Sequence, residues 1–318
     1  MMALNRILHS RRARELWLPL GGRCGMLRRA ESRLGGTLTI LTYHRVLPDE
    51  QAAVYPFDSL AVPLSAFRQQ IAWLKQRTVL PLGQAMRDLA ARCREVPLFS
   101  ITFDDGYIDN YELAAPVIEA AGLNATFFIT AGIVEQGQTL WFDRAVVAAT
   151  AAGLSDPVAW VRSLKSLSPE SREQRIEELR SAVEDTPRGL MMTPEHVRQL
   201  AVRGHEIGSH TMRHPILTHL VPEQLAAELV ESRARLQQWS AQPVEGFCYP
   251  NGDTNEQVIA ACRDAGYTYA CTTRPGRNQL PLDPFALRRV QVDPRRVTRA
   301  GRHDHLAFHA DLCLAEAL

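Results

Sequence analysis

The chain has 318 residues, of which 46% are apolar and 22% are charged, as expected for a globular protein with a substantial core. Its formal net charge of +1 gives no electrostatic reason to expect a nucleic acid or an anionic membrane as partner. The six cysteines include no CxxC pair and no spacing typical of a disulfide framework, so we expect buried or incidental thiols.

The N-terminal segment, residues 1–35, is rich in arginine, and its only acidic residues are Glu15 and Glu31. It lacks the apolar core and cleavage site of a signal peptide, and we expect no integral membrane segment in the chain. We expect an extension that packs on the following domain, and a cytoplasmic location by default. A weak surface-seeking helix around Trp17 and an organellar transit peptide are the alternatives.

Short apolar and β-branched runs alternate with helical patterns along the rest of the chain. Strands are predicted at residues 37–43, 98–103, 125–130, 205–209, 246–249, 267–272 and 287–292. Between them, apolar residues at helical spacing predict helices, for example over residues 225–236. This alternation indicates an α/β fold with a mainly parallel sheet. Periodicity alone leaves open whether the sheet is a barrel or doubly wound.

Residues 135–192 are polar with helical patterns, and we interpret them as a helical insertion. Within it, Ser168 followed by Pro169 predicts a helix start, and Thr193 followed by Pro194 predicts the next one. Farther along, Thr254 predicts a helix N-terminus through a capping box with a glutamine three residues later.

Two motifs carry chemistry. The run Thr102–Tyr107 ends a predicted strand with two adjacent carboxylates, Asp104 and Asp105, and a glycine. Downstream, His210 and His214 are four residues apart, a spacing that places both on one face if the segment is helical. One carboxylate with two imidazoles is a ligand set of catalytic zinc sites with an open position, and the second carboxylate is then free to act as a base. The pattern indicates metal-assisted hydrolysis.

TFDDGY followed by HTxxH resembles the polysaccharide deacetylases, the nodulation-protein-B homology group of the carbohydrate esterases, and is most similar to their poly-N-acetylglucosamine deacetylase branch. The resemblance extends from Thr37 to Val292. It implies a distorted, incomplete (β/α) barrel in a single domain, residues 36–295, with the insertion at about 135–192. Residues 296–318 would form a C-terminal tail.

The resemblance also assigns roles to the motif residues. Asp105, His210 and His214 are the implied ligands of a divalent metal, Zn²⁺ or a similar ion, since mixed imidazole–carboxylate sites do not select sharply. Asp104 is the implied general base. His205 and His219 fall outside the motif, and we expect them to be non-ligands.

The run Phe247–Gly252 resembles the third family motif but departs from it at two positions. Cys248 replaces the arginine that orients the base, and Asn251 replaces a tyrosine whose backbone N–H helps to bind the oxyanion. A backbone donor survives a side-chain change, so we assign this role to the Asn251 N–H. Arg289, in a run that resembles the fourth motif, is expected to supply the missing charge; the alternative is a surface arginine.

The general acid of the family is usually a histidine in a C-terminal motif. The tail contains His303, His305 and His309, none of them in a matching context. His44 is the better candidate, because a Tyr-His at the end of the first strand has this role in the poly-N-acetylglucosamine deacetylase branch. A histidine can protonate a leaving amine near neutral pH. A structural histidine at a strand end is the alternative.

Trp141, Phe142 and Asp143 open the insertion. Exposed aromatic rings there would suit the apolar faces of sugars, and core packing is an equally good interpretation.

The sequence therefore predicts a metal-dependent hydrolase that removes N-acetyl groups from the sugars of a polysaccharide or glycan precursor. An esterase or amidase for another acylated substrate and a non-catalytic carbohydrate-binding protein are the alternatives. The expected partner is an N-acetylated glycan, with peripheral association to glycan-assembly machinery.

Overall fold

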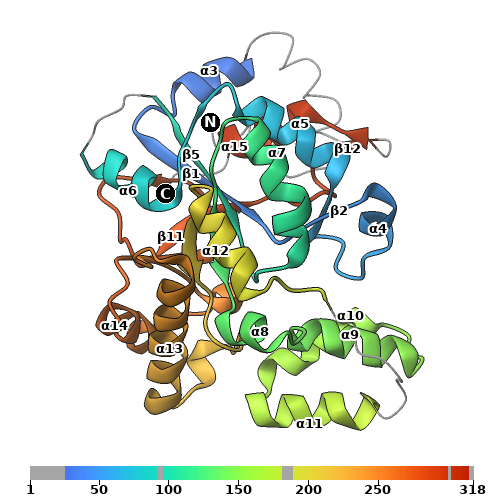
Figure 1. The fold of residues 1–318 in the computed structure, drawn as a ribbon. Helices are drawn as coiled ribbons and strands as arrows, with labels where there is room; N and C mark the ends of the chain where they lie inside the picture. Colours follow the sequence, from blue (N-terminus) through green and yellow to red (C-terminus); the bar gives the residue numbers. More distant parts are fainter. Residues whose placement is uncertain (1–25, 92–95, 181–188, 300–301, 315–318) are drawn as a thin grey trace.

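The computed structural model describes residues 26–91, 96–180, 189–299 and 302–314 (Figure 1). Most of the predicted N-terminal extension, including the helix considered around Trp17, lies outside the described residues. No helix within these described ranges is long and apolar enough to cross a membrane.

Seven parallel strands form a closed barrel. In the order around the sheet they are β1 (Thr37–Tyr43), β11 (Leu287–Gln291), β9 (Tyr269–Pro275), β8 (Gly246–Cys248), β7 (Glu206–Ser209), β6 (Thr126–Ile129) and β5 (Leu98–Phe103). The barrel closes because β5 also pairs with β1, in register from Leu38↔Leu98 to Tyr43↔Phe103. The predicted α/β barrel is confirmed, and it is incomplete in having one strand fewer than the eight of a full (β/α) barrel.

The barrel strands form where the chain has continuous apolar and β-branched runs. Every residue of β1 and β5 is buried, as expected for parallel strands with both faces covered. Aromatic rings of the strands pack outward against the helices: Phe103 stacks on Phe127 with ring centroids 5.0 Å apart, and Phe67 of α5 packs edge-on against Tyr43 at 5.2 Å. A separate apolar cluster fills the inside of the barrel with residues from several strands, including Leu38, Phe128 and Leu287. The barrel is therefore a packed core, and chemistry is confined to its ends.

Shorter strands extend or flank the barrel. They are β4 (Thr78–Val79), beside β5; β10 (Asn278–Gln279), antiparallel to β1; β2 (Arg45–Leu47), paired with β3 (Ala61–Pro63); and β12 (Thr298–Arg299), paired with β13 (Arg302–His303). None of these short strands was predicted from the sequence, because two or three residues give too little periodicity to recognise.

Helices surround the barrel (Figure 1). Those on its wall are α5 (Leu64–Leu74), α6 (Leu82–Ala90), the π-helical turn η1 (Asn110–Ala114) with α7 (Ala115–Ala120), α12 (Pro194–Val202), α13 (Pro222–Ser240) and α14 (Glu256–Asp264). The remaining elements outside the insertion are α3 (Met26–Ser32), α4 (Asp49–Val54), η3 (Leu217–His219), η4 (Pro250–Gly252) and α15 (His305–Leu314).

Local capping chemistry sets several helix starts. The Ser168 hydroxyl accepts a hydrogen bond from the Ser171 N–H, and Thr193 forms a capping box with His196, as the start signals predicted. The predicted capping box at Thr254 is wrong. Asn255 caps α14 instead, because its side-chain oxygen accepts the Val258 N–H at 2.9 Å.

Between β6 and β7 the chain forms a group of helices: α8 (Ala131–Gln136), α9 (Trp141–Ala151), α10 (Pro157–Ser163), η2 (Leu164–Ser166) and α11 (Pro169–Arg180). Helices α9 to α11 share an apolar cluster of their own that includes Trp141, Val161 and Ile176. They stand at the lower end of the molecule in Figure 1. The domain boundaries taken from the sequence stay a prediction.

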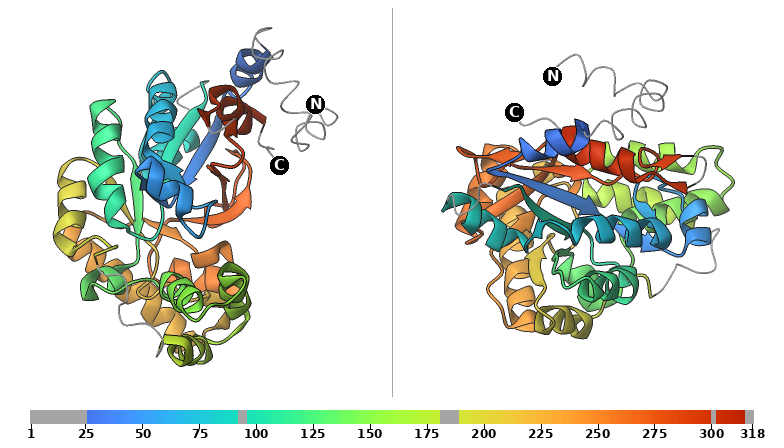
Figure 2. Two further views of the ribbon diagram at one scale, coloured as in Figure 1. Left: turned by 90° about the vertical axis from the view of Figure 1, so that its right-hand side faces the viewer. Right: turned by 90° about the horizontal axis from the view of Figure 1, so that it is seen from above.

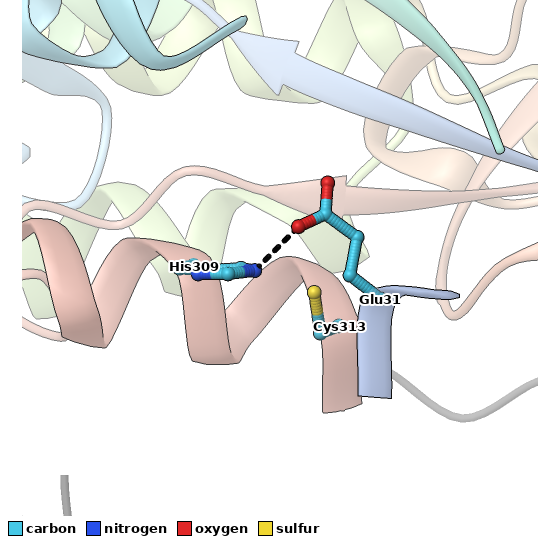
Figure 3. Close-up of side chains that lie close together, drawn as sticks. All are labelled: Glu31, His309 and Cys313. Atoms are coloured by element: carbon cyan, nitrogen blue, oxygen red, sulfur yellow. Dashed lines mark ion pairs between the residues drawn. The ribbon is translucent and has the colours of Figure 1, made fainter. Parts of the chain in front are cut away.

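The terminal helices α3 and α15 pack on each other at the end of the molecule opposite the insertion (Figure 2, left view). Between them, the His309 Nε2 atom lies 2.9 Å from the Glu31 carboxylate, and Cys313 is close by (Figure 3). Arg77 also pairs with Glu31 through its Nε and Nη2 atoms. The predicted tail therefore packs on α3, which leads directly into β1, and on α5.

Candidate active site

The predicted site residues gather at one edge of the barrel. Asp104 and Asp105 follow β5, His210 follows β7 and His44 follows β1, while Arg289 lies on β11. Because the carboxyl ends of parallel strands meet at the same edge, residues far apart in sequence converge there. The structure thus brings both motifs and the two expected auxiliary residues together.

Backbone conformations in the left-handed region orient the side chains of the two motifs. Asp105 has φ 79°, so the two adjacent carboxylates leave the strand in different directions. After β7, Thr211 (φ 72°) and His214 (φ 56°) bend the chain, and the Thr211 hydroxyl accepts the His214 N–H at 2.9 Å. The helical segment considered for the histidine pair is therefore wrong, and a tight loop brings the two imidazoles together.

Asp105, His210 and His214 form a buried cluster. The Nε2 atoms of both histidines lie 3.4 Å from the Asp105 Oδ1 atom, and the three residues can each direct one ligand atom to a common ion. The His210 Nδ1–H donates to the Cys248 carbonyl oxygen at 2.7 Å. That hydrogen bond fixes the tautomer and leaves Nε2 free as a ligand atom, the usual arrangement for metal-binding histidines.

His214 is prepared for the same role by its surroundings. Burial and the neighbouring His210 lower the pKa of His214 to about 3, so the imidazole is neutral at physiological pH, the form that binds metals. Phe142 packs edge-on against the His214 ring, with centroids 5.5 Å apart. The donor set of two imidazoles and one carboxylate fits a divalent ion such as Zn²⁺, and it does not select among such ions.

Asp104 forms an ion pair with Arg289 and is not one of the three clustered residues Asp105, His210 and His214. The Arg289 Nη1 and Nη2 atoms donate to the two carboxylate oxygens at 2.8 and 2.7 Å, and Nε donates to the Thr272 carbonyl at 3.0 Å. Both charged residues are buried. Although burial alone would raise it, the guanidinium holds the pKa of Asp104 well below its usual range. Asp104 is therefore ionised throughout the physiological pH range.

Cys248 lies where the family motif has an arginine. Its Sγ atom is 3.6 Å from the Asp104 Oδ2 atom, and burial raises the pKa of the thiol to about 11. A protonated thiol is a poor metal ligand, although Cys248 also lies close to Asp104 and His210. Because the Cys248 side chain is small, Arg289 of β11 can reach the Asp104 carboxylate. Arg289 thus supplies the positive charge that an arginine at position 248 would have supplied.

His44 also lies near Asp104. Its Nε2 atom is 3.9 Å from the Asp104 Oδ2 atom, too far for a hydrogen bond, and its side chain is 21% exposed. The His44 carbonyl accepts a hydrogen bond from the Asn110 side chain, which anchors the backbone at the end of β1. The imidazole is thus positioned beside the carboxylate with access to solvent.

Asn251 lies in the turn after β8 with φ 58°, followed by Gly252 with φ 80°. A Cβ atom on Gly252 would lie 2.0 Å from the Thr273 hydroxyl, so the turn requires glycine there. The Asn251 side chain contacts Lys165 of the insertion and Asp253. The side chain is thus engaged away from the chemistry, and the role of the backbone N–H stays a prediction.

A buried polar network beside the site was missed in the sequence. The hydroxyls of Tyr55 and Tyr107 donate to the two oxygens of Asp143 at 3.0 and 2.7 Å, and the Arg45 guanidinium lies over both rings. Burial raises the pKa of the Asp143 carboxyl to about 6. Tyr107 closes the first motif and Asp143 opens the insertion, but nothing in their sequence spacing indicated that they would meet.

Two further histidines, His205 and His309, and the aromatic residue Trp141 have structural contacts. His205 accepts the Ala125 N–H through Nδ1 and lies 3.0 Å from Glu119 through Nε2, while His309 pairs with Glu31 (Figure 3). Trp141 is 4% exposed, so core packing is the correct interpretation for its ring.

A parallel barrel with a carboxylate–histidine–histidine cluster and a second, ion-paired carboxylate at its carboxyl edge defines the class of this protein as a hydrolase of the deacetylase type. The family model described as "Polysaccharide deacetylase" matches residues 91–270. The chain belongs to the polysaccharide deacetylase family, and the resemblance seen in the motifs is confirmed. Members of this family hydrolyse the N-acetyl amide bonds of polysaccharides, which confirms the predicted enzyme class.

Two relatives are similar in sequence. The chain is 26% identical over 260 residues to the Bacillus subtilis (strain 168) protein named "Putative polysaccharide deacetylase YxkH", covering 81% of this chain and 72% of the relative. Over 78 residues it is 32% identical to the peptidoglycan-N-acetylglucosamine deacetylase of Bacillus cereus (strain ATCC 14579), covering 24% of this chain and 36% of that protein.

The fold also matches solved structures. The Streptococcus pyogenes deacetylase PplD, solved in complex with acetate, superposes with a TM-score of 0.60 at 20% identity, covering 82% of this chain and 94% of that one. At this identity the likeness supports the barrel fold alone.

Proposed function

We propose that the protein is a metal-dependent N-deacetylase that removes acetyl groups from the N-acetylated sugars of a glycan and releases acetate. The observation that carries the proposal is the placement of the Asp104 carboxylate, which is ion-paired with Arg289 and 3.9 Å from His44, near the cluster of Asp105, His210 and His214. These residues supply the base, the acid and the metal ligands that amide hydrolysis needs.

Asp105, His210 and His214 would hold the divalent ion, which supplies Lewis-acid polarisation of the acetamide carbonyl when bound. Asp104 accepts a proton from the attacking water. Arg289 keeps that carboxylate ionised and fixes its two oxygens, so the base does not need to rotate or to lose a proton first. Charge development at the carbonyl oxygen is stabilised by the Asn251 N–H.

His44 donates a proton to the departing amine. Its partial exposure and its position at the end of β1 suit a residue that must exchange protons with solvent between turnovers. The nitrogen leaves as a neutral amine, which removes the need to expel an amide anion.

The glycan substrate is proposed from the family and from the peptidoglycan-N-acetylglucosamine deacetylase relative, which suggest an N-acetylglucosamine-containing chain. The same site could hydrolyse an O-acyl ester or another amide, because the hydrolytic groups do not distinguish these bonds. Action in the cytoplasm and association with glycan-assembly machinery stay predictions from the sequence.

The test is acetate release from β-1,4- and β-1,6-linked N-acetylglucosamine oligomers by the metal-loaded protein. We expect release that a chelator abolishes and that falls about 10²–10⁴-fold in Asp104→Asn. Near-full activity of an Asp104→Asn protein that still binds metal would overturn the assignment of the base. No release from a protein with one bound ion would favour a different acylated substrate, and no release without bound metal would favour a binding protein.

A further inference from the structure

A cavity of about 810 Å³ lies between the insertion and α13. Its size is within the range of sites that hold small molecules or one or two sugar rings. Arg213 and Pro215, which flank His214 in the loop after β7, form part of its wall, and Arg172 of α11 forms another part. Helices α11 and α13 stand at the same lower end of the molecule in Figure 1. The cavity therefore borders the loop that carries His214.

Most of the charge in the cavity is neutralised locally. Arg144 donates through Nη2 to both oxygens of Glu173 at 2.8 and 2.9 Å. Arg213 donates through Nε to Glu228 at 3.1 Å, and Glu228 also accepts the Arg213 backbone N–H. These two arginines are committed to carboxylates of the protein.

Arg172 is different. It is 3% exposed, its guanidinium lies 4.3 Å from the centroid of the Trp141 ring, and its Nε and Nη1 atoms have no hydrogen-bond acceptor among the described residues. Burial lowers the pKa of the Arg172 guanidinium, against the attraction of the adjacent Glu173, yet an arginine stays charged at any physiological pH. A buried cation with free donors is costly unless an acceptor of opposite charge pairs with it.

The remaining carboxylates do not meet this need. Glu170 and Glu223, which also border the cavity, are exposed, so their charge is screened by solvent. An oxyanion in the cavity would supply the negatively charged partner that the buried Arg172 guanidinium lacks. Apolar wall residues such as Ile133 and Leu220 would contact a sugar face next to it.

We infer that this cavity is a second glycan subsite, in which Arg172 binds an acidic group, a carboxylate or a phosphate, on the same chain whose N-acetyl group reaches the metal ligands. The inference rests on the proposed deacetylase function and adds substrate selectivity to it: the enzyme prefers acidic glycans. The proposed subsite lies against the loop of the metal ligand His214, because Arg213 and Pro215 on either side of it form part of the cavity wall.

The experiment uses four probes: a neutral N-acetylglucosamine tetramer, the same tetramer with a terminal phosphate, a tetrasaccharide alternating N-acetylglucosamine with N-acetylmuramic acid, and the methyl ester of the last. For each, kcat/KM for acetate release and Kd by calorimetry are measured with the metal-loaded protein. We expect at least one acidic probe to exceed its neutral counterpart about tenfold or more in both quantities. The carboxylate and phosphate pairs show which oxyanion is recognised.

Arg172→Gln should reduce the acidic-to-neutral ratio to about one. Arg175→Gln is the matched control, because Arg175 lies on the same helix but its Nη1 atom donates to Glu178 at 2.6 Å. In this variant the acidic-to-neutral ratio should stay at the wild-type value. Arg172→Lys keeps the charge without the planar fork and should give an intermediate ratio. Thermal unfolding verifies that each variant is folded, and if neither Arg172 variant folds, the wild-type ratio still decides.

Equal constants for acidic and neutral probes in the wild type, or an unchanged ratio in Arg172→Gln, would overturn the inference. If no probe releases acetate, the proposed function fails, and the Kd ratios alone then decide whether the cavity binds acidic glycans.

Discussion

Arg289→Gln is the most direct probe of how the site is built. The substitution removes the two hydrogen bonds of 2.8 and 2.7 Å to Asp104 and the bond of 3.0 Å to the Thr272 carbonyl, all of them buried. Breaking a buried ion pair by removing one partner leaves an uncompensated charge and costs about 3–5 kcal/mol. We expect a loss of this size in the free energy of unfolding at pH 7, measured by urea denaturation.

The pH dependence follows from the depressed pKa of Asp104. Because the folded-state pKa lies below the unfolded value, the pair contributes stability above the unfolded pKa, and this contribution is lost as pH falls through the folded one. The difference between wild type and Arg289→Gln should therefore be largest near neutrality and should shrink in acid.

Catalysis should respond as well. Without the guanidinium, burial raises the pKa of Asp104, so kcat/KM of the variant should begin to fall toward acid at a higher pH than that of the wild type. Arg288→Gln, on the same strand, is the control, since the Arg288 Nη1 atom donates to the Pro275 carbonyl and not to Asp104. An Arg289→Gln protein with wild-type stability and the wild-type fall of kcat/KM in acid would refute this account of the base.

Three further predictions concern other parts of the molecule. Burial raises the pKa of Asp143 to about 6, so the wild-type protein should lose about 3 kcal/mol of stability as pH rises from about 4 to above 6. Asp143→Asn should remove that dependence in urea denaturation, and an unchanged slope would contradict it. Zn²⁺ at about 100 times its Kd should stabilise the wild type by about 2.7 kcal/mol, seen as a higher Tm that a chelator reverses. The same addition should leave the Tm of His214→Ala nearly unchanged, and an equal rise in both would place the ion elsewhere. In Gly208→Ala the new Cβ would lie 2.4 Å from the Phe128 ring, so about 1–3 kcal/mol should be lost; an unaltered Tm would show that the ring can move.

Much of the barrel could be predicted from the sequence because its strands are continuous buried runs. The predicted strand at residues 37–43 coincides with β1, and that at 98–103 coincides with β5. Barrel closure could not be predicted from periodicity, because the pairing of β1 with β5 joins segments about 60 residues apart and leaves no local trace. The helix cap at Asn255 could not be predicted because Thr254 and Asn255 are both favourable N-cap residues, and only the backbone geometry selects Asn255.

The sequence by itself determined which residue types carry the chemistry, since two adjacent carboxylates and two spaced histidines stand at strand ends in a pattern specific to one family. Only the tertiary structure decided the partners. Arg289 meets Asp104, and Tyr107 meets Asp143, across wide gaps in sequence. Strand identity depends on local hydrophobic patterning, which a sequence displays directly. Charge pairing depends on which side chains the closed barrel brings together, such as Arg289 and Asp104, whose Nη2 and Oδ2 atoms are 2.7 Å apart. No local sequence pattern indicates that contact.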